Sequence, residues 1–178
     1  MYLFRVYRLF IRAALPVLIS VYGTITGYAK VEIIDGNNGL SNSIVTAIIK
    51  DQRGLMWIGT RNGLNLYDGY SFTKPFRELA NLSVTQLVYD EQRNIVWVGT
   101  DKGVFVVLVN QNVVYNLDTG TEAGRHGVSA IAVIPEQRVC IAYKNGLLVR
   151  FDESFTRQTI ARLKDSGGDN PLALRDMI

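Results

Sequence analysis

The amino-acid sequence predicts an all-β fold made of repeated four-stranded units, and three observations support this prediction. Residues 55–63 read LMWIGTRNG and return as IVWVGTDKG at residues 95–103, an offset of 40 positions. Short apolar runs rich in β-branched residues alternate with tight turns that contain Gly, Asn and Asp. The sequence has no sustained hydrophobic period of 3.6 residues, which a helical repeat would need. A repeat of this length usually indicates one supersecondary unit stacked on copies of itself.

The first two units show the same order of runs and turns. In the first unit, strands are expected at residues 44–49, 55–60, 64–67 and 70–76. In the second unit, strands are expected at residues 84–89, 95–100, 104–109 and 113–117. The turns between them contain Gly and Asn, the residues that adopt a positive φ at the lowest cost. Each unit is therefore predicted to be an antiparallel sheet of four short strands.

The third unit follows the pattern less closely. Its strands are expected at residues 128–134, 139–143, 147–151 and 155–160. Cys140 occupies the position of the tryptophan, and Ala142 occupies the position of the glycine that follows it. Cys140 is expected to be a small buried hydrophobic residue. Because it is the only cysteine of the chain, an intrachain disulfide and a cysteine-built metal site are excluded.

A four-stranded unit of about 40 residues is typical of a β-propeller blade. The sequence therefore predicts a partial β-propeller of about three four-stranded antiparallel blades. We expect these blades at about residues 43–77, 84–118 and 128–161, and the start of a fourth at residues 172–178. A closed ring needs at least about four blades, so we interpret residues 30–178 as a truncated part of a larger propeller.

The repeated tryptophans and glycines are interpreted as structural. Each tryptophan lies on the second strand of its unit, where it can fill the wedge between neighbouring blades. The glycine two residues later has no side chain to obstruct a close approach. The structural positions of the motif are Trp57, Gly59, Gly63, Trp97, Gly99 and Gly103.

The N-terminus has the organisation of a signal peptide at residues 1–29. Residues 1–12 contain three arginines, residues 13–25 form an apolar run, and small residues precede a cleavage site after Ala29. An uncleaved membrane anchor is the alternative, although polar residues interrupt the apolar run. In both cases the chain from Lys30 onwards is expected outside the cytoplasm.

Charge and residue content exclude several classes of function. Without the three arginines of the signal peptide, 16 basic residues face 16 acidic ones, so the basic stripe of a nucleic-acid-binding protein is not expected. His126 is the only histidine, which is too few for a multi-histidine metal site. No catalytic residues, metal site or cofactor are predicted.

Two stretches carry a resemblance to a known family. Residues 39–45, GLSNSIV, and residues 51–64, DQRGLMWIGTRNGL, resemble the two-component regulator propeller repeat. The resemblance covers about residues 33–160 and implies a seven-bladed propeller in the N-terminal periplasmic sensor region of a hybrid two-component sensor histidine kinase. Such a parent is anchored in the inner membrane as a homodimer, and its sensor recognises oligosaccharides. The implied partners are an oligosaccharide and the remaining blades and kinase domains of the parent; this chain has no kinase residues, so it is not expected to be an enzyme.

Candidate ligand-binding residues follow from the strand order of a blade. The loop that leads into the first strand and the turn between the second and third strands lie at the same end of the sheet. The residues gathered there are Asn38, Ser41, Asn42, Arg61, Asn62, Asp101, Lys102, Arg125, His126, Lys144 and Asn145. Their side chains suit sugar hydroxyls, which need donors and acceptors. Tight turns favour the same residue types, so only their convergence at one end indicates binding.

These observations predict a periplasmic ligand-sensing propeller segment for polysaccharide utilisation. A stand-alone secreted propeller is the alternative, acting either as a lyase-type enzyme or as a protein-interaction scaffold. His126 lies in a Gly-rich loop at residues 119–127 and is expected to be a solvent-exposed loop residue.

Overall fold

The structure of the chain is a computed structural model that describes residues 39–134 and 138–163. All described residues belong to one compact unit. The expected signal peptide at residues 1–29, the candidate residue Asn38 and the expected start of a fourth blade at residues 172–178 lie outside the described residues.

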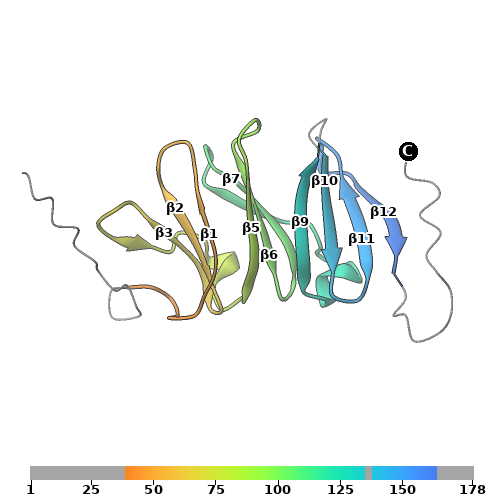
Figure 1. Ribbon diagram of the computed structural model, residues 1–178, viewed down its shortest axis with the longest axis horizontal. Coiled ribbons are helices and arrows are strands. Elements are labelled where there is room, and N and C mark those ends of the chain that lie inside the picture. Colours follow the sequence, from red (N-terminus) through yellow and green to blue (C-terminus); the bar gives the residue numbers. More distant parts are fainter. Residues whose placement is uncertain (1–38, 135–137, 164–178) are drawn as a thin grey trace, which may run out of the picture. The chain divides into compact units, whose positions relative to one another are not determined.

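The described strands form three four-stranded antiparallel sheets, each with its strands in sequence order (Figure 1). The first sheet consists of β1 (Val45–Lys50), β2 (Met56–Thr60), β3 (Gly63–Tyr67) and β4 (Phe72–Thr73). The second sheet consists of β5 (Val84–Asp90), β6 (Ile95–Thr100), β7 (Gly103–Leu108) and β8 (Val113–Asn116). The third sheet consists of β9 (Val128–Ile134), β10 (Arg138–Tyr143), β11 (Leu147–Phe151) and β12 (Arg157–Arg162). The predicted all-β fold of four-stranded units is confirmed.

Short 3-10 helices lie in the two connections between sheets. The helix η2 (Arg77–Leu79) precedes the second sheet, and the helix η3 (Ala123–Arg125) precedes the third. The first strands of the sheets are neighbours, because β5 contacts β1 and β9 contacts β5. The sheets therefore pack in chain order, each through its first strand on the sheet before it.

One expected strand is shorter than predicted. The sequence suggested a strand over residues 70–76, whereas β4 has only two residues, Phe72–Thr73. The carboxylate of Asp68 accepts the backbone N–H groups of Tyr70 and Ser71, both at 2.8 Å, and this holds the chain in a turn. Pro75 has no N–H group to continue the strand pairing.

The first hydrophobic core lies between the first and second sheets. Trp57 is 1% exposed and stacks on Phe76, with ring centroids 5.8 Å apart. It shares this core with Leu66 of its own sheet and with Leu87 and Val98 of the second sheet. Because side chains alternate along a strand, the inward-facing residues of β2 and β3 form one apolar face.

The second core lies between the second and third sheets and repeats this arrangement with different aromatic partners. Trp97 is fully buried, and its ring centroid lies 5.8 Å from both Phe151 and Phe155 of the third unit. The guanidinium carbon of Arg93 lies 5.7 Å from the Trp97 ring centroid and 5.9 Å from that of Phe155. The guanidinium group of Arg93 and three aromatic rings thus pack together between the second and third sheets.

The glycine that follows each tryptophan allows the next sheet to approach closely. A Cβ atom at Gly59 would lie 2.5 Å from Val84 Cγ1, and a Cβ atom at Gly99 would lie 2.8 Å from Val128 Cγ1. Val84 and Val128 open the first strands of the second and third sheets. The same glycine-to-valine contact therefore forms both junctions between sheets.

Gly63 and Gly103 begin the third strands with φ angles of 115° and 101°, in the left-handed region that favours glycine. The hydroxyl groups of Thr60 and Thr100 donate hydrogen bonds to the carbonyl oxygens of these glycines, at 3.0 and 2.8 Å. The Gly-Thr-x-x-Gly part of the repeat thus defines a turn as well as a packing surface.

Cys140 is half-buried, not buried as expected. It pairs with Ala132 and Arg150 and so lies on the opposite face of the third sheet from Ile141, which belongs to the second core. No other described strand covers that face. The prediction that Cys140 is buried was wrong because β10, although apolar on both faces, is covered by another described sheet only on the face that carries Ile141.

We expect Gly59→Ala to lower the free energy of unfolding by about 1–3 kcal/mol, the usual cost of forcing extra volume into a packed interior. The new methyl group would collide with Val84, which β5 holds in place. Urea unfolding followed by circular dichroism measures the effect.

The double variant Gly59→Ala/Val84→Ala provides the matched control. The removal of the Val84 methyl groups makes room for the new one, so the two changes should cost less together than the sum of their separate costs. Strict additivity would contradict a direct contact between these positions.

The turn between β1 and β2 is held by the buried carboxylate of Asp51. Its oxygens accept hydrogen bonds from Trp57 Nε1 at 3.2 Å and from the backbone N–H groups of Arg53 and Leu55 at 2.9 and 3.0 Å. Burial raises the pKa of Asp51, but the hydrogen bonds from Trp57 and Arg53 outweigh it and leave the pKa below its ordinary value. Ionised Asp51 is therefore favoured by the folded state.

A lowered pKa in the folded state means that Asp51 contributes stability above the pKa of the unfolded chain, about 4. This contribution is lost as the pH falls through the lower folded pKa. We expect Asp51→Asn to lose less stability than the natural chain between pH 5 and pH 3. Urea unfolding at several pH values measures this difference, and parallel stability curves would contradict it.

Candidate functional site

The candidate residues lie at one end of each sheet, as the strand order requires. The backbone N–H of Arg61 donates to Ile44 O at 3.2 Å, that of Asp101 to Ser83 O at 2.9 Å and that of Lys144 to Gly127 O at 2.9 Å. Each bond joins the turn between the second and third strands to the loop before the first strand. We call the end that carries these turns the candidate end.

In the first unit, the structure uses the candidate polar groups to fix the backbone. The backbone N–H of Ser41 donates to Asn65 Oδ1 at 2.9 Å, and its hydroxyl group lies 2.8 Å from Thr60 Oγ1. The side-chain oxygen of Asn42 accepts the N–H of Ile44 at 2.8 Å. The buried Asn65, which the sequence analysis did not select, completes this network by donating to Ser41 Oγ at 2.7 Å.

The turns of the second and third units contain similar bonds. The carboxylate of Asp101 accepts the N–H of Ser83 at 3.0 Å, and Asn145 Oδ1 accepts the N–H of Leu147 at 3.1 Å. The amide nitrogen of Asn145 is buried and makes no hydrogen bond within the described chain. A Cβ at Gly127 would lie 3.2 Å from Lys144 Cε and 3.3 Å from Asp101 Cα, so the β6–β7 and β10–β11 turns meet at Gly127.

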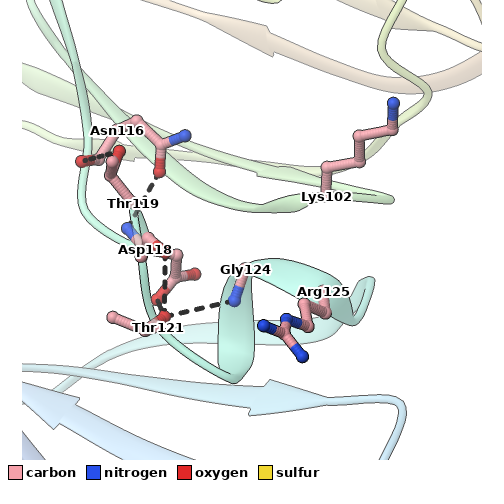
Figure 2. A pocket seen from close by; sticks show the side chains of 8 residues that line it. Lys102, Asn116, Asp118, Thr119, Thr121, Gly124 and Arg125 are labelled. Atoms are coloured by element: carbon pink, nitrogen blue, oxygen red, sulfur yellow. Dashed lines mark hydrogen bonds between the residues drawn. The ribbon is translucent and has the colours of Figure 1, made fainter.

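A surface hollow of about 340 Å³ lies beside η3, between the second and third sheets (Figure 2). Its walls consist of the β6–β7 turn, the loop after β8 and η3. The lining residues are Lys102, Asn116, Asp118, Thr119, Gly120, Thr121, Gly124 and Arg125.

Asp118 fixes the loop that forms one wall of this hollow. Its side chain is 0% exposed, and its Oδ2 atom accepts hydrogen bonds from the Tyr143 hydroxyl at 2.7 Å and from the Val104 N–H at 2.8 Å. Arg157 lies 3.4 Å from Oδ1. Burial raises the pKa of Tyr143 far above its ordinary value, and the Asp118 charge adds to this, so the hydroxyl stays a donor. Asp118 thus ties the loop to both neighbouring sheets.

Thr121 and Gly124 hold the rest of this wall. The Thr121 hydroxyl donates to Asp118 O at 2.9 Å and accepts the Gly124 N–H at 3.2 Å (Figure 2). A Cβ atom at Gly124 would lie 2.5 Å from Asp118 O, so only glycine fits there. This part of the wall is therefore fixed by short-range hydrogen bonds.

Of the candidate residues, only Lys102 and Arg125 line the hollow. Ser41, Asn42, Arg61, Asn62, Asp101, His126, Lys144 and Asn145 lie outside its lining. His126 is half-buried, not exposed as expected. It follows η3 directly, and its backbone N–H donates to Ala123 O at 2.9 Å. The sequence analysis missed the other lining residues, although the Asp-Thr-Gly-Thr run at residues 118–121 offered a signal.

Two further properties concern only the described ranges, 39–134 and 138–163. No group of three or more His, Cys, Asp or Glu residues there is arranged to hold a metal ion. No helix in those ranges is long and apolar enough to span a membrane.

Comparison with known proteins identifies the repeat. Residues 39–62 match the family described as two component regulator propeller. A stretch of 35 residues is 51% identical to histidine kinase P4 of Formosa agariphila, which covers 20% of this chain and 3% of that protein. The resemblance seen in the sequence is thereby confirmed for the first unit.

Solved structures from B. thetaiotaomicron share the fold. The extracellular domain of BT4673, described as a one-component system, gives a TM-score of 0.60 at 25% identity and covers 76% of this chain. The same domain, described as part of a hybrid two-component system, gives 0.64 at 24% identity over 79% of this chain. The extracellular domain of the hybrid two-component system BT3049 gives 0.60 at 21% identity over 74%. The chain spans 18%, 19% and 18% of these three chains, respectively.

Proposed function

We propose that this chain, in which residues 39–62 form a two-component regulator propeller repeat, is a segment of the extracytoplasmic sensor region of a hybrid two-component regulator. The family match in the first unit carries the proposal. The shared fold with extracellular domains of such systems supports it. The role of the segment is then to bind a ligand outside the cytoplasm and to pass the signal to other domains of the parent.

The proposed ligand is an oligosaccharide, and the proposed mode of action is binding without catalysis. The candidate end presents amide, ammonium and guanidinium donors beside hydroxyl and carbonyl oxygens, and sugar hydroxyls need both kinds of partner. Asp118, the most buried carboxylate of the hollow, is already occupied by Tyr143, Val104 and Arg157. A carboxylate held in this way serves the architecture and is a poor general base.

The proposed location is the periplasm, where residues 1–29 direct the chain. The proposed partners are further propeller blades and the kinase domains of a homodimeric parent anchored in the inner membrane. In this arrangement the three sheets supply part of a larger ring.

Gene context tests the sensor role. Reading the DNA on both sides of the coding region should reveal further Trp-x-Gly-Thr repeats, a membrane span and histidine kinase domains. A neighbourhood without repeats, span or kinase would contradict the sensor role and favour a stand-alone propeller.

A binding screen tests the ligand class. The purified full chain should bind at least one oligosaccharide from a panel of neutral and anionic glycans, measured by isothermal titration calorimetry. A panel without a single binder would contradict the proposal that the segment itself senses a glycan.

A further inference from the structure

We infer that the hollow beside η3 binds an anionic oligosaccharide through its carboxylate or sulfate groups. This inference rests on the proposed function, because it names the chemical class of the glycan and the place where it binds. The observations that support it are the lining cations, the state of the nearby carboxylates, and the difference in charge between the two ends of the sheets.

The two cations of the hollow are available to a ligand. Lys102 and Arg125 are exposed, and neither forms an ion pair within the described ranges. The acid that interacts electrostatically with Arg125 is Glu122, which also interacts with His126. Glu122 already forms an ion pair with Arg162 at 2.8 Å, and this hydrogen bond holds the pKa of Glu122 below its ordinary value. The positive charge of Arg125 is therefore only partly balanced.

The carboxylates nearest to the hollow have other partners. Asp118 is buried between Tyr143 and Val104 and faces Arg157. Asp101, next to Lys102, accepts the N–H of Ser83 at 3.0 Å. Among the side chains that line the hollow, the exposed charged groups are therefore those of Lys102 and Arg125. Asp101 lies outside the lining, where it is exposed and keeps its negative charge beside Lys102.

The two ends of the sheets differ in charge. The candidate end also carries Arg61 and Lys144, which are exposed and form no ion pair in the described part of the chain. Asp101 and Glu122 are exposed acids near the candidate end, but cations are in excess there. The turns of the opposite end carry exposed acids at Asp68, Glu91, Asp152 and Glu153 together with the exposed cations Lys50 and Arg53. The excess of exposed cations at the candidate end favours the approach of an anionic ligand to that end.

The placement of the cations predicts the form of the ligand. In Figure 2, Lys102 and Arg125 extend from different walls of the hollow, and their charged groups are not directed at each other. They would therefore meet separate anionic groups of an extended glycan. Asn116 also lines the hollow, across from both cations in Figure 2. Its oxygen accepts the Asp118 N–H at 2.9 Å, and its amide nitrogen remains as a donor for a sugar hydroxyl.

Calorimetric titration of the full chain tests the inference with four probes. Tetragalacturonate carries carboxylates, a heparin tetrasaccharide carries sulfates as well, cellotetraose is neutral, and sodium sulfate supplies the anion alone. We expect one or both anionic glycans to bind, with an affinity that falls as salt is added. Comparison of the first two probes distinguishes carboxylate from sulfate recognition.

Matched variants assign the site. Lys102→Gln and Arg125→Gln should each weaken anionic glycan binding roughly 5- to 20-fold, the range expected when an exposed charge-assisted hydrogen bond is lost. Lys50→Gln removes the same charge from an exposed position at the opposite end and should leave affinity unchanged. Circular dichroism spectra of the variants should match that of the natural chain.

Each remaining outcome has a definite meaning. Equal binding of cellotetraose and the anionic glycans would overturn the inference while leaving oligosaccharide sensing intact. Anionic binding that Lys102→Gln and Arg125→Gln do not change would overturn the assigned site. Sodium sulfate binding as tightly as the glycans would show anion binding without sugar recognition and would also overturn it. Failure of all three glycans would contradict both the inference and the proposed role of this segment in glycan binding.

Discussion

Trp97→Ala is expected to lower the free energy of unfolding by about 3–5 kcal/mol, the usual cost of truncating a buried tryptophan. Trp97 fills the junction between the second and third sheets, where Phe151, Phe155 and Arg93 surround it. Its removal leaves a cavity and also deprives Arg93 of an aromatic partner. Urea unfolding followed by circular dichroism measures the loss.

Tyr70→Ala provides the matched control for Trp97→Ala. Tyr70 is an aromatic residue of the same chain that is 96% exposed, and truncating it should change stability by no more than about 0.5 kcal/mol. If the two variants unfold at the same urea concentration, Trp97 does not support the junction.

Asp118→Ala is expected to lower the free energy of unfolding by about 3 kcal/mol or more. The change leaves the Val104 N–H and the Tyr143 hydroxyl buried without an acceptor, and it leaves Arg157 without its counter-charge. Because Asp118 joins the hollow to both sheets, the loop over residues 117–125 should also become more susceptible to proteolysis. Urea unfolding and limited trypsin digestion measure the two effects.

Two further variants separate the causes of this loss. Tyr143→Phe removes one of the bonds to Asp118 and should cost only about 1 kcal/mol. Glu153→Ala removes an exposed carboxylate that makes no side-chain hydrogen bond among the described residues, and it should leave stability unchanged. If Asp118→Ala behaves like Glu153→Ala, the buried network does not hold the loop.

The repeat made the sheets predictable because it encodes local and packing constraints together. Trp57 and Trp97 mark the second strands, and Gly59 and Gly99 mark the places where the next sheet approaches. The Gly, Asn and Asp residues of the turns marked where these strands begin and end. The shortness of β4 was not predicted, because the hydrogen bonds from the Tyr70 and Ser71 N–H groups to the Asp68 carboxylate depend on side-chain geometry.

The repeat predicted the equivalent positions of Trp57 and Trp97 on their strands, but it did not predict that their indole N–H groups have different partners. Trp57 Nε1 donates to the carboxylate of the turn before it, whereas Trp97 Nε1 makes no hydrogen bond in the described structure. In the second unit the corresponding carboxylate, Asp90, is occupied by Arg93 Nε at 2.7 Å. Asp51 also binds an arginine, Arg53, and still accepts from Trp57. The difference is that Arg93 lies over the rings of Trp97 and Phe155, and Phe155 is distant in sequence.

The candidate site was less predictable than the fold. Strand order placed the turns at one end correctly, but it could not show that Ser41 and Asn42 are used by the backbone around them. It also could not show that the loop over residues 117–125 forms a hollow, because Asp118 acts through Tyr143, 25 residues further along the chain. Long-range partners of this kind leave no local pattern.

The contact between glycine and valine at each junction bears on how a unit of this kind can be duplicated in tandem within a gene. A unit that offers glycine on one face and valine on the other can be duplicated in tandem, because every copy fits the one before it. The third unit has Ala142 at the position that corresponds to these glycines. If a further sheet packed there as the second and third sheets do at Gly59 and Gly99, the Ala142 methyl group would crowd a valine at the start of its first strand. We therefore expect the third unit not to be interchangeable with the first two.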